Sequence, residues 1–196
     1  RWDSRTEALL DPMMGAGTLV IEAARWAAGI APGLHRTFGF ETLGFFEPAT
    51  FSRLKERAQQ VAAEGETTDL QIIGRDQNAG ALVAATSNAE RAGVADRIEL
   101  GLADLRDTPL PDDARCLVSN PPYGLRVGAA KPAWLALGRR IGEHPGPLKL
   151  GLVATAAAKM RTVPATEIKL GAALMTDHGG TKVVLLSGSK PARMDP

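Results

Sequence analysis

Residues Ala8–Thr18, with the sequence ALLDPMMGAGT, join a short apolar run to a glycine-rich turn. The apolar run 8–10 predicts a buried strand. The apolar residues after the turn recur at helical spacing as far as Gly29 (Leu19, Val20, Ala23, Ala24 and Ala27). Gly15 and Gly17 let the backbone bend and approach a ligand, which the N–H groups of the helix start would face. This strand–turn–helix unit predicts an α/β fold with a ligand site at the turn.

A dinucleotide site is the main alternative for this turn. Its fingerprint requires a third small residue where Val20 stands and an acid about 20 residues further on, which is missing. The turn instead carries Asp11 before its glycines. A carboxylate repels a pyrophosphate but attracts an ammonium or sulfonium group. The turn therefore favours a positively charged ligand.

A second turn, Ser119–Gly124 (SNPPYG), follows the apolar run 116–118. Two successive prolines cannot continue a strand ladder or begin a normal helix, so they hold the chain rigid just past a strand end, where open α/β sheets bind ligands. The Asn120 side chain and the Pro121 carbonyl can both accept hydrogen bonds from one amino group. Tyr123 can stack on the ring that bears this group. Because Asn-Pro and Pro-Pro also occur in ordinary turns, the motif needs support from the rest of the chain.

Acidic residues follow two further predicted strands. The strand at 70–75 ends at Asp76, and a helix begins at Gln77 or Asn78. Asp76 can accept hydrogen bonds from neighbouring ribose hydroxyls, or it can cap the helix. Asp104, which can accept a hydrogen bond from an exocyclic amine, follows a third strand of alternating apolar residues (Ile98, Leu100 and Leu102).

Repeated strand–helix units imply parallel strands with right-handed crossovers, so the four strand ends would share one edge of one sheet. A fifth strand is expected at 148–153, with a short helix at 154–160. The runs 168–175 and 182–186 flank two glycines and predict an antiparallel hairpin. We therefore expect a single α/β domain over residues 1–196, with a doubly wound and mostly parallel sheet.

The composition narrows the function. A net charge of +1 gives no overall nucleic-acid signature, so such binding would depend on a local patch or another domain. The single cysteine, Cys116, excludes an internal disulfide and fits a reducing cytoplasm. No apolar run is long enough to span a membrane. The histidines, which we expect in loops or at the surface without a metal, are His35, His144 and His178.

Residues 29–51 interrupt the strand–helix alternation and contain most of the phenylalanines. We expect an apolar plug that packs this connection onto the core; a lid over the ligand is the alternative. A helix at 51–63 would follow, with its apolar residues on one face (Leu54, Ala58 and Val61). A modest basic cluster could hold phosphates or remain solvated (Arg126, Lys131, Arg139 and Arg140).

The motifs together resemble a known family. Leu10–Thr18, Ser119–Gly124 and the segments 21–24, 30–33, 38–41 and 88–93 are similar to class I S-adenosylmethionine-dependent methyltransferases of the Asn-Pro-Pro-Tyr kind. Within that class they resemble the catalytic domain of THUMP-containing RNA guanine-N2 methyltransferases. The likeness covers residues 8–130, and the last third of the chain matches only in pattern.

The resemblance implies a seven-stranded sheet with its last strand antiparallel, S-adenosylmethionine as cofactor, and ribosomal or transfer RNA as substrate. It assigns the methionine part of the cofactor to the first turn (Asp11, Pro12, Met13, Gly15, Gly17 and Thr18). It assigns the ribose to Asp76 with Gln77 and the adenine amine to Asp104. The resemblance assigns catalysis to the second turn (Asn120, Pro121, Pro122 and Tyr123). It also places Asn120 against the cofactor.

Two departures from the family stand out. The family commonly has Cys-Gly-Ser-Gly at positions 14–17, where this chain has Met-Gly-Ala-Gly; the glycines are kept, so we expect cofactor binding to survive. We also expect the chain to be a piece of a longer protein, without the amino-terminal RNA-capturing domain that the family carries. Among enzymes, the alternatives for the second turn of this chain are an adenine amine in DNA or RNA and a glutamine amide in a protein substrate. A cofactor-binding RNA scaffold without activity is the alternative outside the enzymes.

Overall fold

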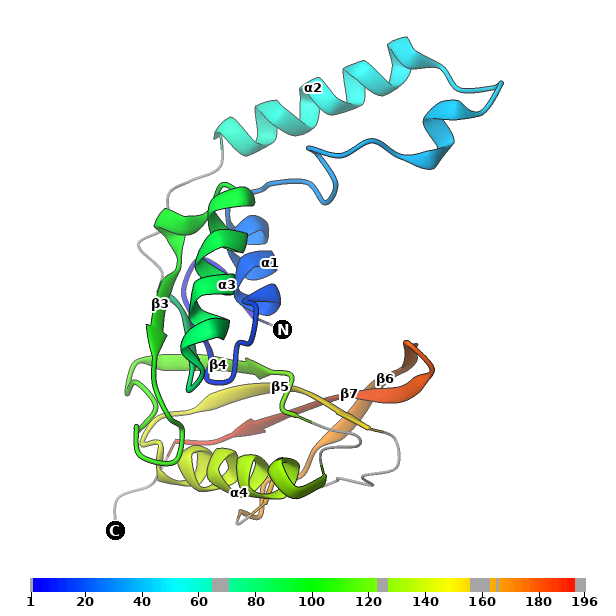
Figure 1. Cartoon of the computed structure of the whole chain (residues 1–196). Helices are drawn as coiled ribbons and strands as arrows, with labels where there is room; N and C mark the ends of the chain where they lie inside the picture. The colour runs from blue at the N-terminus through cyan, green and yellow to red at the C-terminus, as the bar shows by residue number, and fades with distance from the viewer. Residues whose placement is uncertain (1, 65–70, 123–126, 156–162, 165, 193–196) are drawn as a thin grey trace.

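The computed structural model describes residues 2–64, 71–122, 127–155, 163–164 and 166–192. Its strands are β1 (Ala8–Asp11), β2 (Ile72–Asp76), β3 (Glu99–Leu102), β4 (Ala114–Ser119), β5 (Leu148–Thr155), β6 (Gly171–His178) and β7 (Thr181–Lys190). Its helices are α1 (Thr18–Ala27), α2 (Pro48–Glu64), α3 (Ala79–Arg91) and α4 (Val127–Glu143), with short 3-10 turns η1 (Gly39–Thr42) and η2 (Ala95–Arg97). Figure 1 shows their arrangement.

All seven strands form one sheet in the order β3-β2-β1-β4-β5-β7-β6. The first five in this order are parallel, and β7 runs antiparallel to both of its neighbours. The expected doubly wound sheet with its last strand antiparallel is confirmed. The strand order reverses between β1 and β4, and such a switch point is where open α/β sheets bind ligands.

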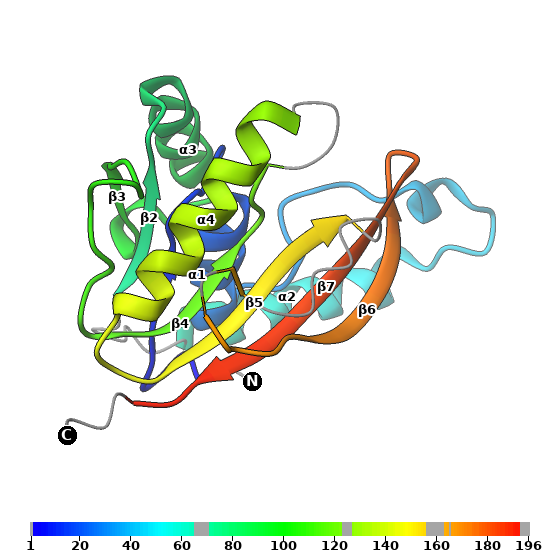
Figure 2. The same cartoon turned by 90° about the horizontal axis from the view of Figure 1, so that it is seen from below.

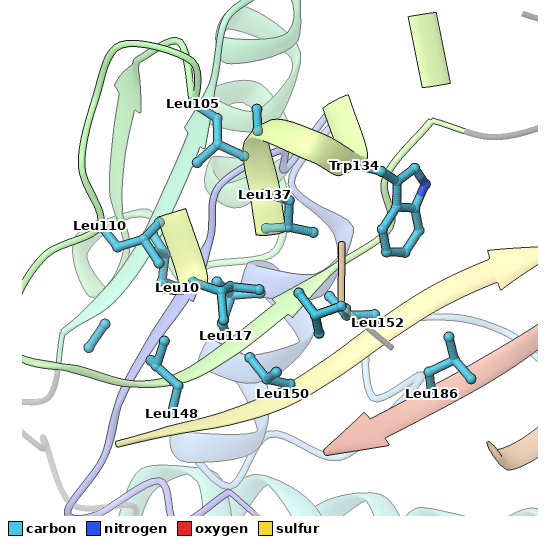
Figure 3. Packing of buried hydrophobic residues seen from close by; sticks show 14 of the residues in the cluster. Leu10, Leu105, Leu110, Leu117, Trp134, Leu137, Leu148, Leu150, Leu152 and Leu186 are labelled. Carbon is cyan, nitrogen blue, oxygen red and sulfur yellow. The ribbon is translucent and has the colours of Figure 1, made fainter. Parts of the chain in front are cut away.

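The two faces of the sheet are covered by different helices (Figure 2). Because side chains alternate along a strand, Leu9 and Cys116 face one side with α1 and α3, while Leu10 and Leu117 face the other with α4. Figure 3 shows the larger of the two clusters, in which Leu137 of α4 packs above leucines from β1, β4 and β5. Strands buried on both faces explain why β1 and β4 are short continuous apolar runs.

The helix α3 starts as predicted, but its buried face is only partly the predicted one. Asn78 is its N-cap residue, and the Asn78 side chain accepts a hydrogen bond from the Gly80 N–H at 2.8 Å. Helical spacing predicts that this helix turns one face inward (Leu82, Val83, Thr86 and Ala89). Ala89 is buried as expected and Leu82 is half-buried, but Val83 and Thr86 are exposed, and Ala85 is buried in addition. The buried residues of this face are small because α3 packs closely against the start of α1, where Ala85 lies beside Gly17.

The expectation of a plug over residues 29–51 is wrong. Four phenylalanines of this insert, the last of them in α2, pack on one another with ring centroids 5.2–6.0 Å apart (Phe38, Phe40, Phe46 and Phe51), while Phe45 is exposed. The helix α2 has no buried residue, and Leu54 is 61% exposed. In Figure 1 the insert and α2 project away from the sheet. We call residues 29–64 the arm.

The position of the arm also argues against a lid. The helix α1 has ten residues and runs back from the carboxyl ends of the strands, so it carries the chain about 15 Å away from the first turn. The arm leaves from that far end. The two turns lie at the carboxyl ends of the parallel strands. The arm therefore lies beyond the opposite edge of the sheet, where these strands begin (Figure 1).

Other parts of the chain differ from expectation in detail. The strand β5 continues to Thr155, where we expected a helix, and the remainder of that predicted helix falls outside the described residues. His144 follows α4 in a loop but is buried at 3% exposure, with its ring nitrogens 3.1 Å from the Gly146 carbonyl oxygen and 3.0 Å from that of Pro111. Across the described ranges, no helix has the length and apolarity that a membrane crossing requires.

Candidate active site

Four strand ends bring the predicted site residues to one edge of the sheet. Asp11 is the last residue of β1, Asp76 is the last residue of β2, and Asn120 directly follows β4. Asp104 lies two residues beyond β3. Because these four strands are parallel, all four residues belong to the same edge.

Asp11 is the most deeply buried acid of this edge, at 1% exposure. Its Oδ1 atom accepts hydrogen bonds from the Met13 backbone N–H at 3.1 Å and from the Ser119 hydroxyl at 2.8 Å. Burial raises the pKa of Asp11 to about 7, and the negative charge of Asp76 acts in the same direction, against these two hydrogen bonds. A carboxyl group that titrates near neutral pH beside a ligand turn is typical of functional sites.

The backbone conformation of the first turn is fixed by a glycine and by long-range hydrogen bonds. Gly17 is the N-cap residue of α1 with φ of 83°, and a Cβ atom there would lie 3.0 Å from the Ala85 Cβ of α3. Only glycine combines this left-handed backbone with that close approach. The Met14 N–H donates to the Arg75 carbonyl at 2.9 Å, and the Asn88 side chain of α3 donates to the Ala16 carbonyl at 2.8 Å. Neighbouring elements thus fix the turn from both sides.

Asp76 links the first turn to α3. One carboxylate oxygen accepts from the Gly15 N–H at 2.9 Å, and the other accepts from the Asn78 N–H at 2.9 Å. The helix cap itself is Asn78, so the simple capping role considered for Asp76 belongs to its neighbour. Each carboxylate oxygen can accept more than one hydrogen bond, so Asp76 keeps acceptor capacity for a ligand.

Asp104 is paired with Arg106. The Arg106 backbone N–H donates to Asp104 at 2.8 Å and its Nε donates to both carboxylate oxygens at 3.0 Å. These hydrogen bonds lower the pKa of Asp104 to about 2. The same guanidinium reaches the exposed Gln77 side chain at 3.5 Å. Since Arg106 is largely exposed, the pair is weak, and a ligand amine can compete for the carboxylate.

The helix α4 holds the Asp104 loop from the other face. The Arg140 Nε donates to the Leu105 carbonyl at 2.9 Å, and its Nη2 donates to the Arg106 carbonyl at 2.7 Å. The Arg139 side chain donates to the same Arg106 carbonyl. Both arginines thus contact the loop; Arg140 is largely buried there, whereas Arg139 remains exposed, as in the solvated alternative for the basic cluster. Of the other members of that cluster, Lys131 is exposed and Arg126 lies outside the described residues.

The second turn presents its residues alternately. The Asn120 and Pro122 side chains are exposed, while Pro121 is buried and anchors the turn. Tyr123 lies outside the described residues, so its stacking role stays a prediction. Asn120 directly follows Ser119, which places the amide next in the chain to the hydroxyl that contacts Asp11.

Sequence reasoning missed several residues that shape this edge. Ser119, Asn88 and Arg140 act through contacts with residues 108, 72 and 35 positions away in the chain, which no local pattern reveals. Gly74 of β2 was also missed: a Cβ atom there would lie 2.5 Å from the Met14 sulfur. A glycine inside a predicted strand is a known signal for such close approach.

Two cavities flank β1, and only the first of them is lined by a residue of the first turn. One of 330 Å³ is lined by the loop after β3 and by Leu10 and Pro12, and the other, of 550 Å³, lies between α1 and the sheet and is lined by Trp26, Ile30 and Val118. Within the described ranges, no group of three or more histidine, cysteine, aspartate or glutamate residues is placed to hold a metal ion.

A doubly wound sheet in this strand order, with acids at three strand ends and an Asn-Pro-Pro turn at the fourth, is the arrangement of a class I methyltransferase domain. The chain matches the family described as an RMKL-like methyltransferase domain over residues 2–155, and it belongs to that family. The expected relationship is confirmed.

Curated relatives carry the name ribosomal RNA large subunit methyltransferase K/L. The protein from Vibrio campbellii is 42% identical over 140 residues, covering 69% of this chain and 20% of the relative. The protein from Shewanella baltica is 40% identical over 129 residues, covering 65% of this chain and 18% of the relative. The chain thus spans about a fifth of the length of these relatives.

Solved structures share the fold. The crystal structure of SMU.472 in complex with SAH superposes with a TM-score of 0.78 at 24% sequence identity, covering 100% of this chain and 50% of that chain. TrmN from Thermus thermophilus superposes with a TM-score of 0.59 at 21% sequence identity, covering 94% of this chain and 44% of that chain. A protein from Listeria monocytogenes is described as a predicted N6-adenine-specific DNA methylase. It superposes with a TM-score of 0.72 at 25% sequence identity, covering 92% of this chain and 46% of that chain.

Proposed function

We propose that the domain transfers a methyl group from S-adenosylmethionine to an exocyclic amino nitrogen of an RNA base, with guanine N2 of ribosomal RNA as the first choice and transfer RNA as the second. The observation that carries the proposal is the edge itself: Asp11, Asp76, Asp104 and Asn120 end or follow four adjacent parallel strands at the switch point of the sheet. Membership of a methyltransferase family and the names of the curated relatives support it.

The residues present fit this cofactor by their chemistry. S-adenosylmethionine offers an ammonium group, two ribose hydroxyls and an adenine amine, all of which donate hydrogen bonds. The strand ends offer carboxylates, which accept them. Asp11 with the first turn would hold the ammonium end (Pro12, Met13, Gly15, Gly17 and Thr18). Asp76 and Gln77 would hold the ribose, and Asp104 would hold the adenine amine. When bound, the cofactor supplies an electrophilic methyl group on its sulfonium.

The second turn would act on the target base. The lone pair of a guanine or adenine amino nitrogen is delocalised into the ring, which makes the nitrogen a poor nucleophile. Asn120 Oδ1 and the Pro121 carbonyl accept hydrogen bonds from the two amino hydrogens and so favour a tetrahedral nitrogen whose lone pair faces the methyl group. Pro122 keeps the turn rigid, and Tyr123 receives the base that has left its stack. The rate gain comes from positioning and charge placement.

The polymer and the base are open to one direct experiment. The chain would be incubated with cofactor labelled in its methyl group and with ribosomal RNA, transfer RNA or DNA, and the nucleosides would be separated after digestion. We expect label in N2-methylguanosine from ribosomal RNA. Label in N6-methyl-2′-deoxyadenosine from DNA would instead support the activity suggested by the Listeria neighbour. A ribosomal RNA substrate would also place the protein in the cytoplasm.

Weak capture of RNA is part of the proposal. The net charge of +1 gives little attraction for phosphates, and Arg139 and Arg140 are engaged by loop carbonyls. We therefore expect a high KM for RNA with this chain, falling when an amino-terminal RNA-binding domain of a longer relative is fused to it. No incorporation into any polymer at saturating RNA would contradict the proposed activity.

A further inference from the structure

We infer that Ser119 is a positioning residue that ties the cofactor-binding carboxyl group of Asp11 to the catalytic turn beginning at Asn120. This inference rests on the proposed function, which supplies the cofactor and the target base. It adds a residue that neither turn motif explains. Ser119 does not itself need to touch the cofactor or the base.

The geometry of the contact carries the inference. The Ser119 hydroxyl donates to Asp11 Oδ1 at 2.8 Å, although the two residues lie 108 positions apart in the sequence. They come from β1 and β4, which pair in parallel at the switch point of the sheet. Ser119 is 0% exposed and Asp11 is 1% exposed, so water does not replace this hydrogen bond if it is lost.

Among the described residues, three groups act on the charge of Asp11. The Met13 N–H comes from the first turn and the Ser119 hydroxyl comes from β4; both are uncharged and both stabilise the carboxylate. The charged group that acts on Asp11 is Asp76 at the end of β2, which opposes ionisation. Since burial already raises the pKa of Asp11 to about 7, each stabilising hydrogen bond decides whether the carboxyl group is ionised at neutral pH.

The role predicts how cofactor binding depends on pH. An ammonium group is attracted by the ionised form of Asp11, so affinity for S-adenosylhomocysteine should fall as the pH drops through about 7. In Ser119→Ala the lost hydrogen bond raises the pKa of Asp11. The midpoint of the affinity curve should then move up by about one pH unit, the size of one hydrogen bond to a charged group.

Two measurements together test whether the Ser119 hydroxyl controls the ionisation of Asp11. NMR titration of the Asp11 side-chain carboxyl carbon in the cofactor-free chain, assigned with Asp11→Asn, reports its ionisation without any ligand. Calorimetric titration with S-adenosylhomocysteine from pH 5.5 to 8.5 reports affinity. We expect Ser119→Ala to move both midpoints upward and Ser119→Thr, which keeps the hydroxyl, to restore them. Ser187→Ala, at an exposed serine of β7, is the matched control and should leave both unchanged.

The outcomes are distinct. An unchanged Asp11 titration in folded Ser119→Ala would overturn the tie. A shifted titration with an unshifted affinity curve would also overturn it, since the carboxyl group would then have no part in cofactor binding. Absence of S-adenosylhomocysteine binding to the unaltered chain at every pH would instead refute the proposed function on which the inference rests. If Ser119→Ala does not fold, Ser119→Cys keeps the volume with a much weaker donor and takes its place.

Discussion

The strand-end edge and the arm are both glycine-bearing irregular regions, yet they are held in opposite ways. At the edge, Gly15, Met14 and Ala16 are bonded to residues of β2 and α3 that lie far along the chain. In the arm, the phenylalanines contact one another and α2, and α2 buries nothing. The edge is therefore rigid through the sheet, whereas the arm is organised by its own local contacts. This difference indicates that ligand chemistry belongs to the edge.

The largest difference is expected in turnover. Replacing Asn120 by alanine removes an acceptor that the proposed mechanism uses only as the amino nitrogen changes shape, so kcat should fall about 100-fold with little change in cofactor affinity. The matched control is Gln59→Ala, an exposed amide on α2, which should leave kcat unchanged. Methyl-transfer kinetics and calorimetry give the two quantities. Lost cofactor affinity with preserved turnover per bound complex would remove Asn120 from the catalytic role.

A smaller effect is expected on cofactor affinity. Asp76→Ala removes the acceptor for the Gly15 and Asn78 N–H groups and the proposed ribose ligand. The Kd for S-adenosylhomocysteine should rise about 20-fold, the range for a hydrogen bond to a charged group. The control is Glu56→Ala, an exposed acid of α2. Equal affinities for the two variants would exclude Asp76 from the cofactor site.

A pair of glycine substitutions compares the rigidity of the two regions. Gly17→Ala places a Cβ atom 3.0 Å from the Ala85 Cβ at φ of 83°, and we expect a loss of about 1–2 kcal/mol in the free energy of unfolding. Gly44→Ala, in the arm, meets nothing within 4 Å and should change stability by less than about 0.5 kcal/mol. Chemical denaturation measures both. Similar losses would mean that the arm is as constrained as the first turn.

The smallest expected effect concerns the arm and the cofactor. The Phe51 ring lies within 6.0 Å of the Phe38, Phe40 and Phe46 rings, so Phe51→Ala should loosen the arm and increase hydrogen exchange of the amide groups in α2. Cofactor affinity should change less than about twofold, since the arm leaves from the far end of α1. A tenfold loss of affinity would restore the lid that the structure argues against.

The sequence predicted the edge because its signals are local. The order of strand, acid, glycines and helix at Ala8–Thr18 depends only on neighbouring residues, and the same is true of the acids at 76 and 104 and of the second turn. The parallel direction of the first strands follows from the repeated strand–helix units, whereas the seven-stranded sheet with its last strand antiparallel was expected from the resemblance to the methyltransferase family.

The remainder was not predictable because it depends on partners. The apolar face of α2 indicates a helix, but periodicity does not say whether another element covers Leu54. The buried face of α3 is set by how closely α1 approaches Ala85, so alanine displaced the larger Val83. Ser119 and Arg140 act across 108 and 35 positions of sequence, and a hydroxyl or guanidinium carries no local sign of such a contact.

A crystal structure of the chain with S-adenosylhomocysteine would test the central claim most directly. The account predicts that the ligand lies along the strand ends, with its amino group beside Asp11, its ribose against Asp76, its adenine amine at Asp104 and its sulfur facing Asn120. A ligand that leaves the first turn empty and occupies instead the 550 Å³ cavity, which none of the proposed cofactor-binding residues lines, would contradict it.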